Sequence, residues 1–245
     1  MMFHVLRYAE CDKMILGGLQ KLTLIDYPGH VAATVFTVGC NFRCPFCHNP
    51  ELVHATRNTQ HATFLEEEFF KLLRERQGKL EGVCITGGEP TIQPDLPEFI
   101  RKIKELGFKV KLDTNGARPD VLKQLYDDKM LDFVAMDIKN DLENYEKLAN
   151  SKIDMERIKL SADLIRNSGI DYEFRTTVVP GLHVEADFEK IGQWLKGSKK
   201  YVLQAFEDKG KILDPRLKKK IKGKRLNLEK IAKKIEKYFG KVEIR

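Results

Sequence analysis

Three of the five cysteines of the chain fall on one short stretch with the spacing C-x3-C-x2-C, namely Cys40, Cys44 and Cys47. Cysteine thiolates are the usual protein ligands of iron–sulfur clusters, and a cluster held by four of them is typical of electron transfer. Three thiolates on a tight loop can hold three irons of a cubic 4Fe–4S cluster and leave the fourth iron open to another ligand. The spacing therefore predicts a 4Fe–4S cluster at which a reaction takes place.

Zinc is the other metal that clustered cysteines bind, and His48 follows Cys47 directly. Structural zinc sites take four ligands, commonly from two separated pairs of Cys or His. The sequence offers no second pair downstream, and adjacent residues seldom ligate the same ion well. The cluster is therefore the favoured interpretation, and a zinc site is the alternative.

The composition is that of a globular protein made in a reducing compartment. The chain has 245 residues, of which 42% are hydrophobic, enough for a sizeable core. It contains no apolar run of the roughly 18 residues that a membrane span requires, and its first residues lack the apolar stretch of a secretory signal. The odd number of cysteines argues against a disulfide framework. We expect a cytoplasmic protein with no membrane association, with Cys84 in the core and no role for Cys11.

The positive charge is concentrated in one segment. The formal net charge is +7, and the segment 208–225 alone has nine Lys and Arg against two Asp, so the rest of the chain is neutral. The segment is either a solvated connector or a surface for an acidic partner or a nucleic acid. It contains no aromatic residue of the kind that stacks on single-stranded bases, so nucleic acid is not the expected partner.

Segments with the pattern of strands alternate with helical segments along the chain. The predicted strands are Val31–Val38, Gly82–Thr86, Phe108–Leu112, Phe133–Ile138, Tyr172–Val179 and Tyr201–Phe206, with an edge strand at Val242–Ile244. The helices between them begin at capping residues or at proline: Thr63, Asp95, Pro119, Asp154 and Asn227. Another helix spans the apolar residues from Phe188 to Leu195.

Six successive βα units imply an α/β fold with a mostly parallel sheet and outer helices. A closed barrel of this type needs eight units. We therefore predict a partial (β/α)6 barrel whose sheet is open on one side. The active site of such a sheet lies at the carboxyl ends of its strands.

The chemically distinctive residues all follow predicted strands. After the cysteine loop come Thr86–Pro90, Asp113–Gly116, Asp137 with Lys139, Arg175 and Gln204, each within or just beyond a strand. Each has a structural alternative: Gly87-Gly88 and Asn115-Gly116 read as turns, Lys139 as a surface lysine, and Arg175 as an ion-pair residue of the barrel interior. Their common position at strand ends favours one shared site.

These motifs resemble a known family. Cys40–Cys47, with an aromatic residue before the last cysteine, and Gly-Gly-Glu-Pro at 87–90 are similar to the radical S-adenosylmethionine superfamily. The stretches Gly18–Gly29 and Cys47–Glu51 resemble activating enzymes of glycyl-radical enzymes. The nearest group is the activating protein of anaerobic ribonucleoside-triphosphate reductase, followed by pyruvate formate-lyase activating enzyme.

The resemblance covers roughly residues 14–206, the expected radical S-adenosylmethionine core. Residues 1–13 would be an N-terminal extension. Residues 207–245 would be a basic connector followed by a helix and edge strand that pack on the core, all in one domain.

The resemblance implies a role for each candidate residue. Cys40, Cys44 and Cys47 would hold the cluster, and its open iron would chelate the amino and carboxylate groups of S-adenosylmethionine. Phe46 would pack near the adenine. The methionyl ammonium would meet Gly87, Gly88 and Glu89, while Lys139, assisted by Arg175, would pair with the methionyl carboxylate.

Asp113, Thr114 and Asn115 would line the cofactor pocket, and a monovalent cation is expected near Asp113 and Asp137. Gln204 also belongs to the predicted pocket, and the formate-lyase relatives carry a histidine near this sixth strand.

The implied activity is reductive cleavage of S-adenosylmethionine to a 5′-deoxyadenosyl radical, which would generate a glycyl radical on a partner enzyme. A low-potential donor such as a flavodoxin or ferredoxin would supply the electron. Two alternatives remain: a radical enzyme acting on a small molecule such as a deazapurine precursor, and, more remotely, a zinc-dependent nucleic-acid-binding module.

Overall fold

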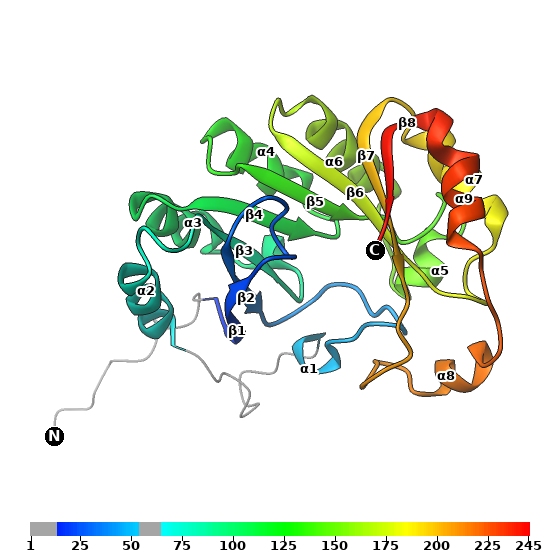
Figure 1. The fold of residues 1–245 in the computed structure, drawn as a ribbon, viewed down its shortest axis with the longest axis horizontal. Coiled ribbons are helices and arrows are strands. Elements are labelled where there is room, and N and C mark those ends of the chain that lie inside the picture. Colours follow the sequence, from blue (N-terminus) through cyan, green and yellow to red (C-terminus); the bar gives the residue numbers. More distant parts are fainter. Residues whose placement is uncertain (1–13, 54–64) are drawn as a thin grey trace, which may run out of the picture.

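The computed structural model describes residues 14–53 and 65–245, and one sheet organises this part of the chain. Its eight strands lie side by side in the order of the chain (Figure 1). The first pair of strands is antiparallel and every later pair is parallel. The strands are β1 (Leu16–Thr23), β2 (Ala32–Thr37), β3 (Gly82–Gly87), β4 (Lys109–Thr114), β5 (Phe133–Asp137), β6 (Asp171–Val178), β7 (Ser198–Ala205) and β8 (Phe239–Ile244). β1 and β8 do not pair with each other, so the sheet is open, as the sequence predicted.

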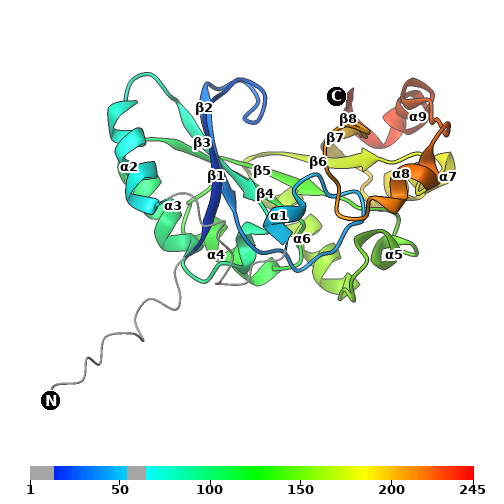
Figure 2. The same ribbon diagram turned by 90° about the horizontal axis from the view of Figure 1, so that it is seen from below.

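Helices fill the connections between the parallel strands. They are α1 (Pro50–Val53), α2 (Glu66–Glu75), α3 (Leu96–Glu105), α4 (Pro119–Asp127), α5 (Tyr145–Ala149), α6 (Met155–Asn167), α7 (Glu185–Trp194), α8 (Arg216–Ile221) and α9 (Leu228–Ile235), with 3-10 turns at Pro90–Ile92 and Glu236–Tyr238. Seen from two directions, α3, α4 and α6 lie along one face of the sheet (Figures 1 and 2). The α/β architecture with outer helices is therefore the predicted one.

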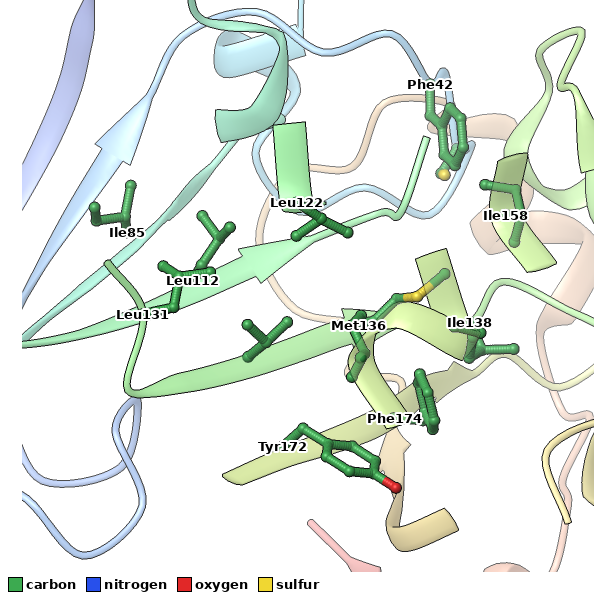
Figure 3. Packing of buried hydrophobic residues seen from close by; sticks show 14 of the residues in the cluster. Phe42, Ile85, Leu112, Leu122, Leu131, Met136, Ile138, Ile158, Tyr172 and Phe174 are labelled. Atoms are coloured by element: carbon green, nitrogen blue, oxygen red, sulfur yellow. The ribbon is translucent and has the colours of Figure 1, made fainter. Parts of the chain in front are cut away.

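The face of the sheet that carries these helices is apolar. Successive side chains of a strand point to opposite faces, and on this face Leu112, Met136 and Phe174 have no exposed surface. They belong to the same buried cluster as Leu122 of α4 and Ile158 of α6 (Figure 3). Burial of such side chains contributes roughly 1.5–3 kcal/mol each, so this layer holds the strands in place.

The opposite face of the same strands is charged. It carries Lys111 and Asp113 from β4, Asp137 from β5, and Glu173 and Arg175 from β6. Charged side chains are rarely buried without partners, yet Lys111 and Glu173 are 1% and 0% exposed. This inner face is therefore built from ion pairs. At the carboxyl ends of the strands it opens into the site described below.

The six predicted parallel strands are present, with ends that differ by at most three residues from the prediction. The predicted edge strand at Val242–Ile244 is also present and begins earlier, at Phe239, where it pairs with β7. β1 was not predicted, because its sequence LGGLQKLT contains two glycines and lacks the β-branched run that marks a strand.

Two predicted helix caps agree with the structure and one differs from it. Asp154 caps α6 by accepting the N–H of Glu156. Asn227 caps α9 by accepting the N–H of Lys230, as expected. Asp95 precedes α3 but makes no capping bond; its carboxylate accepts the N–H of Met14 at 2.8 Å instead. Thr63, the expected cap of α2, lies outside the described residues, as do the extension 1–13 and its Cys11.

Candidate active site

A cavity of about 320 Å³ lies at the carboxyl ends of the parallel strands. This volume falls in the range of small-molecule and cofactor sites. The cavity is lined by the three clustered cysteines and by every predicted cofactor-binding residue: Cys40, Cys44, Cys47, Phe46, Gly87, Gly88, Glu89, Asp113, Thr114, Asn115, Lys139, Arg175 and Gln204. The fold therefore brings together residues that are spread over more than half of the sequence.

The cysteine loop leaves the end of β2 and is held by hydrogen bonds to distant segments. The N–H of Gly39 donates to the carbonyl of Leu52 at 2.7 Å, and the N–H of Arg43 donates to Ala149 at 2.9 Å. The guanidinium of Arg43 turns back and donates to the carbonyl of Cys40. These bonds fix the loop through its backbone, and its thiols are left to face the cavity.

The thiols of the loop are poor ligands until a cation binds. Burial raises the pKa of all three, that of Cys40 to about 12, and the ammonium of Lys139 opposes the increase at each. Metal binding requires thiolates, and the positive charge of the metal stabilises them. The irons of a cluster would supply the positive charge that these buried thiols need.

The arrangement of the thiols fits a cluster better than a single metal ion. Within residues 14–53 and 65–245, no group of three or more Cys, His, Asp or Glu side chains has the geometry to hold one metal ion. A cubic cluster binds each thiolate to a different iron and therefore keeps its ligands apart. His48, the other candidate zinc ligand, stacks on Phe206 with the ring centroids 5.1 Å apart.

Gly87 and Gly88 are required by the close approach of two backbone segments. A side chain at either position would overlap the backbone of Thr37 or Gly39, and Gly87 has a φ of +110°. The N–H of Gly88 donates to the carbonyl of Thr37, and the N–H of Glu89 donates to the carbonyl of Gly39, both at 2.8 Å. The absence of side chains thus lets the loop after β3 lie directly against the start of the cysteine loop.

Glu89 is buried and its carboxylate accepts four hydrogen bonds from protein donors. It is 1% exposed and accepts hydrogen bonds from the backbone and hydroxyl of Thr91, the hydroxyl of Thr114 and the backbone of Asn115. Burial raises the pKa of this carboxyl, and the four donors oppose that increase. In this structure the side chain of Glu89 therefore joins the ends of β3 and β4.

Two carboxylates and three cations form a buried charged group across β4, β5 and β6. The guanidinium of Arg175 lies between Asp113, at 3.0 Å, and Asp137, at 2.5 Å. Lys111 pairs with the other oxygen of Asp113, and Lys139 pairs with Asp137 at 3.1 Å. Arg175 therefore makes the ion pairs of the structural alternative and also lines the cavity.

The group stays ionised although it is buried. Burial alone would raise the pKa of Asp113 and of Asp137, but Arg175 and the two lysines outweigh it and hold both pKa values below the usual range. Burial alone would lower the pKa of Lys139, and Asp137 more than reverses that effect. The group thus combines three cations with two carboxylates, and its Asp113, Asp137, Lys139 and Arg175 line the cavity.

The remaining predicted contacts line the cavity without ion pairs. Phe46 is 5% exposed and lies between two of the cysteines in sequence. Gln204 of β7 lies beside Thr177 of β6 in the register of the two strands, and both face the cavity. Gln204 and Thr177 add a neutral, polar section beside the charged side chains that line the cavity.

Several residues of the site were not predicted from the sequence. Lys111 supports Asp113 from two positions back on the same strand, a spacing that places both side chains on one face. The side chain of Asn41 accepts the amide of Asn115 at 2.8 Å and so joins the cysteine loop to the end of β4. Asp26, which accepts the hydroxyl of Thr34 at 2.6 Å, brings the connection between β1 and β2 to the cavity.

The segment after β7 lies against the outside of the cysteine loop. The N–H of Leu213 donates to the carbonyl of Cys47 at 3.0 Å, and the N–H of Asp214 donates to that of Pro45 at 2.9 Å. The start of the basic segment 208–225 is therefore fixed to the loop that carries the thiols.

A partial barrel with three thiols at its strand ends defines an enzyme class that uses a cluster with an open iron. Residues 34–195 match the Radical SAM superfamily, and the chain belongs to it. Membership in this family implies a 4Fe–4S cluster and S-adenosylmethionine, for which the cavity supplies thiols, charge and space. It leaves no support for the zinc-dependent nucleic-acid-binding module.

Individual relatives within the superfamily carry names that state a more specific activity. The chain is 35% identical to "Putative glycyl-radical enzyme activating enzyme MJ1227" of Methanocaldococcus jannaschii over 240 residues, which cover 95% of this chain and 96% of that one. It is 31% identical to the pyruvate formate-lyase-activating enzyme of Streptococcus mutans over 206 residues, 79% of this chain and 75% of that one.

The fold has counterparts among solved structures. The crystal structure of Streptococcus suis SuiB bound to S-adenosylmethionine superposes with a TM-score of 0.62 at 15% identity, over 84% of this chain and 47% of that chain. The chain thus spans about half the length of that protein, and the likeness concerns the fold.

Among the helices of the described residues, none is long and apolar enough to cross a membrane.

Proposed function

We propose that this protein activates a glycyl-radical enzyme. The observation that carries the proposal is the similarity along 95% of the chain to a relative named for that activity. When bound, the cluster and S-adenosylmethionine supply the chemistry: one-electron reduction cleaves the cofactor to methionine and a 5′-deoxyadenosyl radical, which removes a hydrogen atom from a glycine Cα of the partner. No acid or base is required from the protein in that abstraction.

In this proposal the side chains of the cavity bind and orient the two cofactors. Cys40, Cys44 and Cys47 hold three irons. Phe46 packs near the adenine, and the neutral wall with Gln204 faces the nucleoside. Lys139 attracts the methionyl carboxylate, with the positive charge of Arg175 behind it. Gly87, Gly88 and Glu89 meet the methionyl ammonium, while Asp113, Thr114 and Asn115 line the cofactor pocket.

The open edge of the sheet suits a macromolecular substrate. Leu24 and Ile25, on the connection between β1 and β2, are 69% and 80% exposed, and the next residue, Asp26, lines the cavity. Exposed apolar side chains beside a site favour contact with another protein. A glycine-bearing loop of the partner could therefore pack on this connection as it enters the cavity.

Some finer features of the proposal rest on the sequence alone. They are a flavodoxin or ferredoxin as electron donor, a cytoplasmic location, and the division into an extension, a core at 14–206 and a C-terminal part at 207–245. The monovalent cation near Asp113 and Asp137 also stays a prediction. In this structure Lys111, Arg175 and Lys139 pair with the carboxylate oxygens of these two residues.

The test is anaerobic. The protein is reconstituted with iron and sulfide, reduced, and supplied with S-adenosylmethionine; 5′-deoxyadenosine is expected. Incubation with an anaerobic ribonucleotide reductase from the same organism should then produce a glycyl-radical signal in electron paramagnetic resonance. Absence of 5′-deoxyadenosine with a verified cluster would refute the radical chemistry. Cleavage that is stimulated by a deazapurine precursor, with no radical on the partner, would establish the small-molecule alternative.

A further inference from the structure

The basic segment 208–225 is a structured part of the molecule and lies next to the cysteine loop. It contains α8, whose Leu217 and Ile221 are buried together with Ile212. Its first residues are fixed to the loop by the bonds to Cys47 and Pro45. In Figures 1 and 2 the segment runs beside the loop that follows β2. The segment is therefore held against the cysteine loop, and its exposed charges belong to the surface over the cluster site.

Most of the charges of this segment face the solvent and are not neutralised. Of its nine basic residues, three pair with acids nearby: Lys209 with Glu207, Arg216 with Asp214 and Lys218 with Asp208. The other six are exposed and make no ion pair with any residue of 14–53 or 65–245: Lys211, Lys219, Lys220, Lys222, Lys224 and Arg225. Like charges this close repel one another, a cost that a bound anionic surface would remove.

We infer that this basic face is the docking site of an acidic one-electron donor protein. The inference rests on the proposed function, which consumes one electron for each S-adenosylmethionine cleaved. The donor is oxidised by one electron, the cluster is reduced by one, and no proton or group is transferred at this step. Electron transfer slows steeply with distance, and the peptide units of the face contact those of Cys47 and Pro45 directly. An electron from a donor bound here would thus reach the cluster through the backbone of the cysteine loop.

Charge complementarity suits this kind of partner. Redox partners form small, transient interfaces, and complementary charge raises their rate of association. Nucleic acid is the competing anionic partner, but the segment offers no aromatic side chain on which bases could stack. The buried apolar side of α8 is used internally, so only its charged side is available to a partner.

The test compares the wild type with the variant K219Q/K220Q/K222Q in binding and in turnover. An acidic flavodoxin is the probe. Its affinity, measured by calorimetry at low salt, should fall roughly tenfold in the variant, because each rim charge contributes about 0.5 kcal/mol. Flavodoxin-supported formation of 5′-deoxyadenosine should fall in parallel, while dithionite-supported formation should stay within about twofold of the wild type. Binding by the wild type should weaken as salt is raised.

A matched control uses basic residues at the other end of the sheet. Lys71, Arg74 and Lys79 lie on or just after α2, are exposed, and lie far from α8 in both views (Figures 1 and 2). The variant K71Q/R74Q/K79Q makes the same change in net charge and should bind flavodoxin like the wild type. Equal losses in the two variants, or no loss in either, would overturn the inference. So would binding of a single-stranded oligonucleotide that the α8 variant loses while its flavodoxin affinity is unchanged.

Failure of the docking inference can be distinguished from failure of the proposed function. If dithionite supports no cleavage in the wild type, the proposed function fails. The calorimetric comparison still decides whether the basic face binds the donor, because it requires no turnover.

Discussion

The carboxylate of Glu89 accepts the backbone N–H of Asn115 at 2.6 Å, so the loop after β3 and the loop after β4 share one buried anion. The same carboxylate also accepts from Thr91 and Thr114. Glu89, which family resemblance expects to meet the methionyl ammonium, thus also links two walls of the cavity.

Replacing Glu89 by Gln should damage both the fold and the site. The amide keeps the size of the side chain, but its NH2 group replaces an oxygen that accepted hydrogen bonds. Each buried N–H or O–H group that loses its acceptor costs about 1–3 kcal/mol. The free energy of unfolding should fall by roughly that amount, and affinity for S-adenosylmethionine should fall about tenfold. Urea unfolding and equilibrium binding measure the two effects. The exposed Glu68→Gln of α2 is the control, and an E89Q variant that matches it would contradict the linking role.

Replacing Cys44 by Ala should abolish the cluster. Iron and acid-labile sulfide after reconstitution should drop to background, and 5′-deoxyadenosine should not form, because two thiolates do not hold three irons. Cys84→Ala is the matched control, since Cys84 is buried in β3 and does not line the cavity. It should load iron and sulfide like the wild type. Full cluster content in C44A would refute the ligand assignment.

Lys111 should matter chiefly through Asp113. Its ammonium is 1% exposed and pairs with that carboxylate, so Lys111→Met leaves a buried charge with one partner fewer and should cost about 3–5 kcal/mol. The double variant K111M/D113N removes both charges and should lose less than the sum of the single changes. A double-mutant cycle by urea unfolding gives the coupling energy. Additive losses would show that the pair contributes nothing.

The charged group should also give stability a defined pH dependence. The folded-state pKa values of Asp113 and Asp137 lie below their unfolded values. Their contribution is therefore present above the unfolded pKa, about 4, and is lost as pH falls toward the folded values. In Arg175→Met both folded values move up, so the free energy of unfolding should fall less steeply below pH 4 than in the wild type. Parallel curves from acid titration would contradict this.

The exposed apolar pair beside the cavity should affect only the macromolecular substrate. Leu24→Ser together with Ile25→Ser should leave cofactor cleavage without partner unchanged. At a subsaturating concentration of the partner the yield of glycyl radical should fall by about a hundredfold or more, since burying the two side chains contributes about 3–6 kcal/mol together. Leu160→Ser, at an exposed position of α6, is the control. A double variant that gives the wild-type radical yield would exclude this contact surface.

Much of this site could be predicted because it follows from strand order. Side chains at the ends of adjacent parallel strands meet, so residues such as Asp113, Lys139 and Gln204 could be grouped once the strands were recognised. The partners of those residues were harder to find. Lys111 lies inside a strand, where a lysine reads as a solvent-facing residue, and the four donors to Glu89 come from backbone and hydroxyl groups that carry no distinct sequence pattern.

The C-terminal cover of the cysteine loop could not be predicted either. Its bonds from Leu213 and Asp214 are between backbone groups, and its sequence is dominated by lysines that indicate exposure. Only the alternation of Leu217 and Ile221 with lysines hinted at a short helix with one buried side. Contacts that depend on tertiary position, with no local pattern of their own, are the part of the structure that sequence reasoning missed.

The strands lie in the sheet in the order in which they are synthesised, and this has a consequence for biogenesis. Each new strand pairs with the one made just before it, so the sheet can grow from β1 as the chain leaves the ribosome. The cysteine loop follows the second strand, whereas the segment that covers it follows the seventh. During translation the thiols therefore exist on a formed sheet edge before their cover is made, which leaves an interval in which assembly machinery could insert the cluster into an uncovered loop.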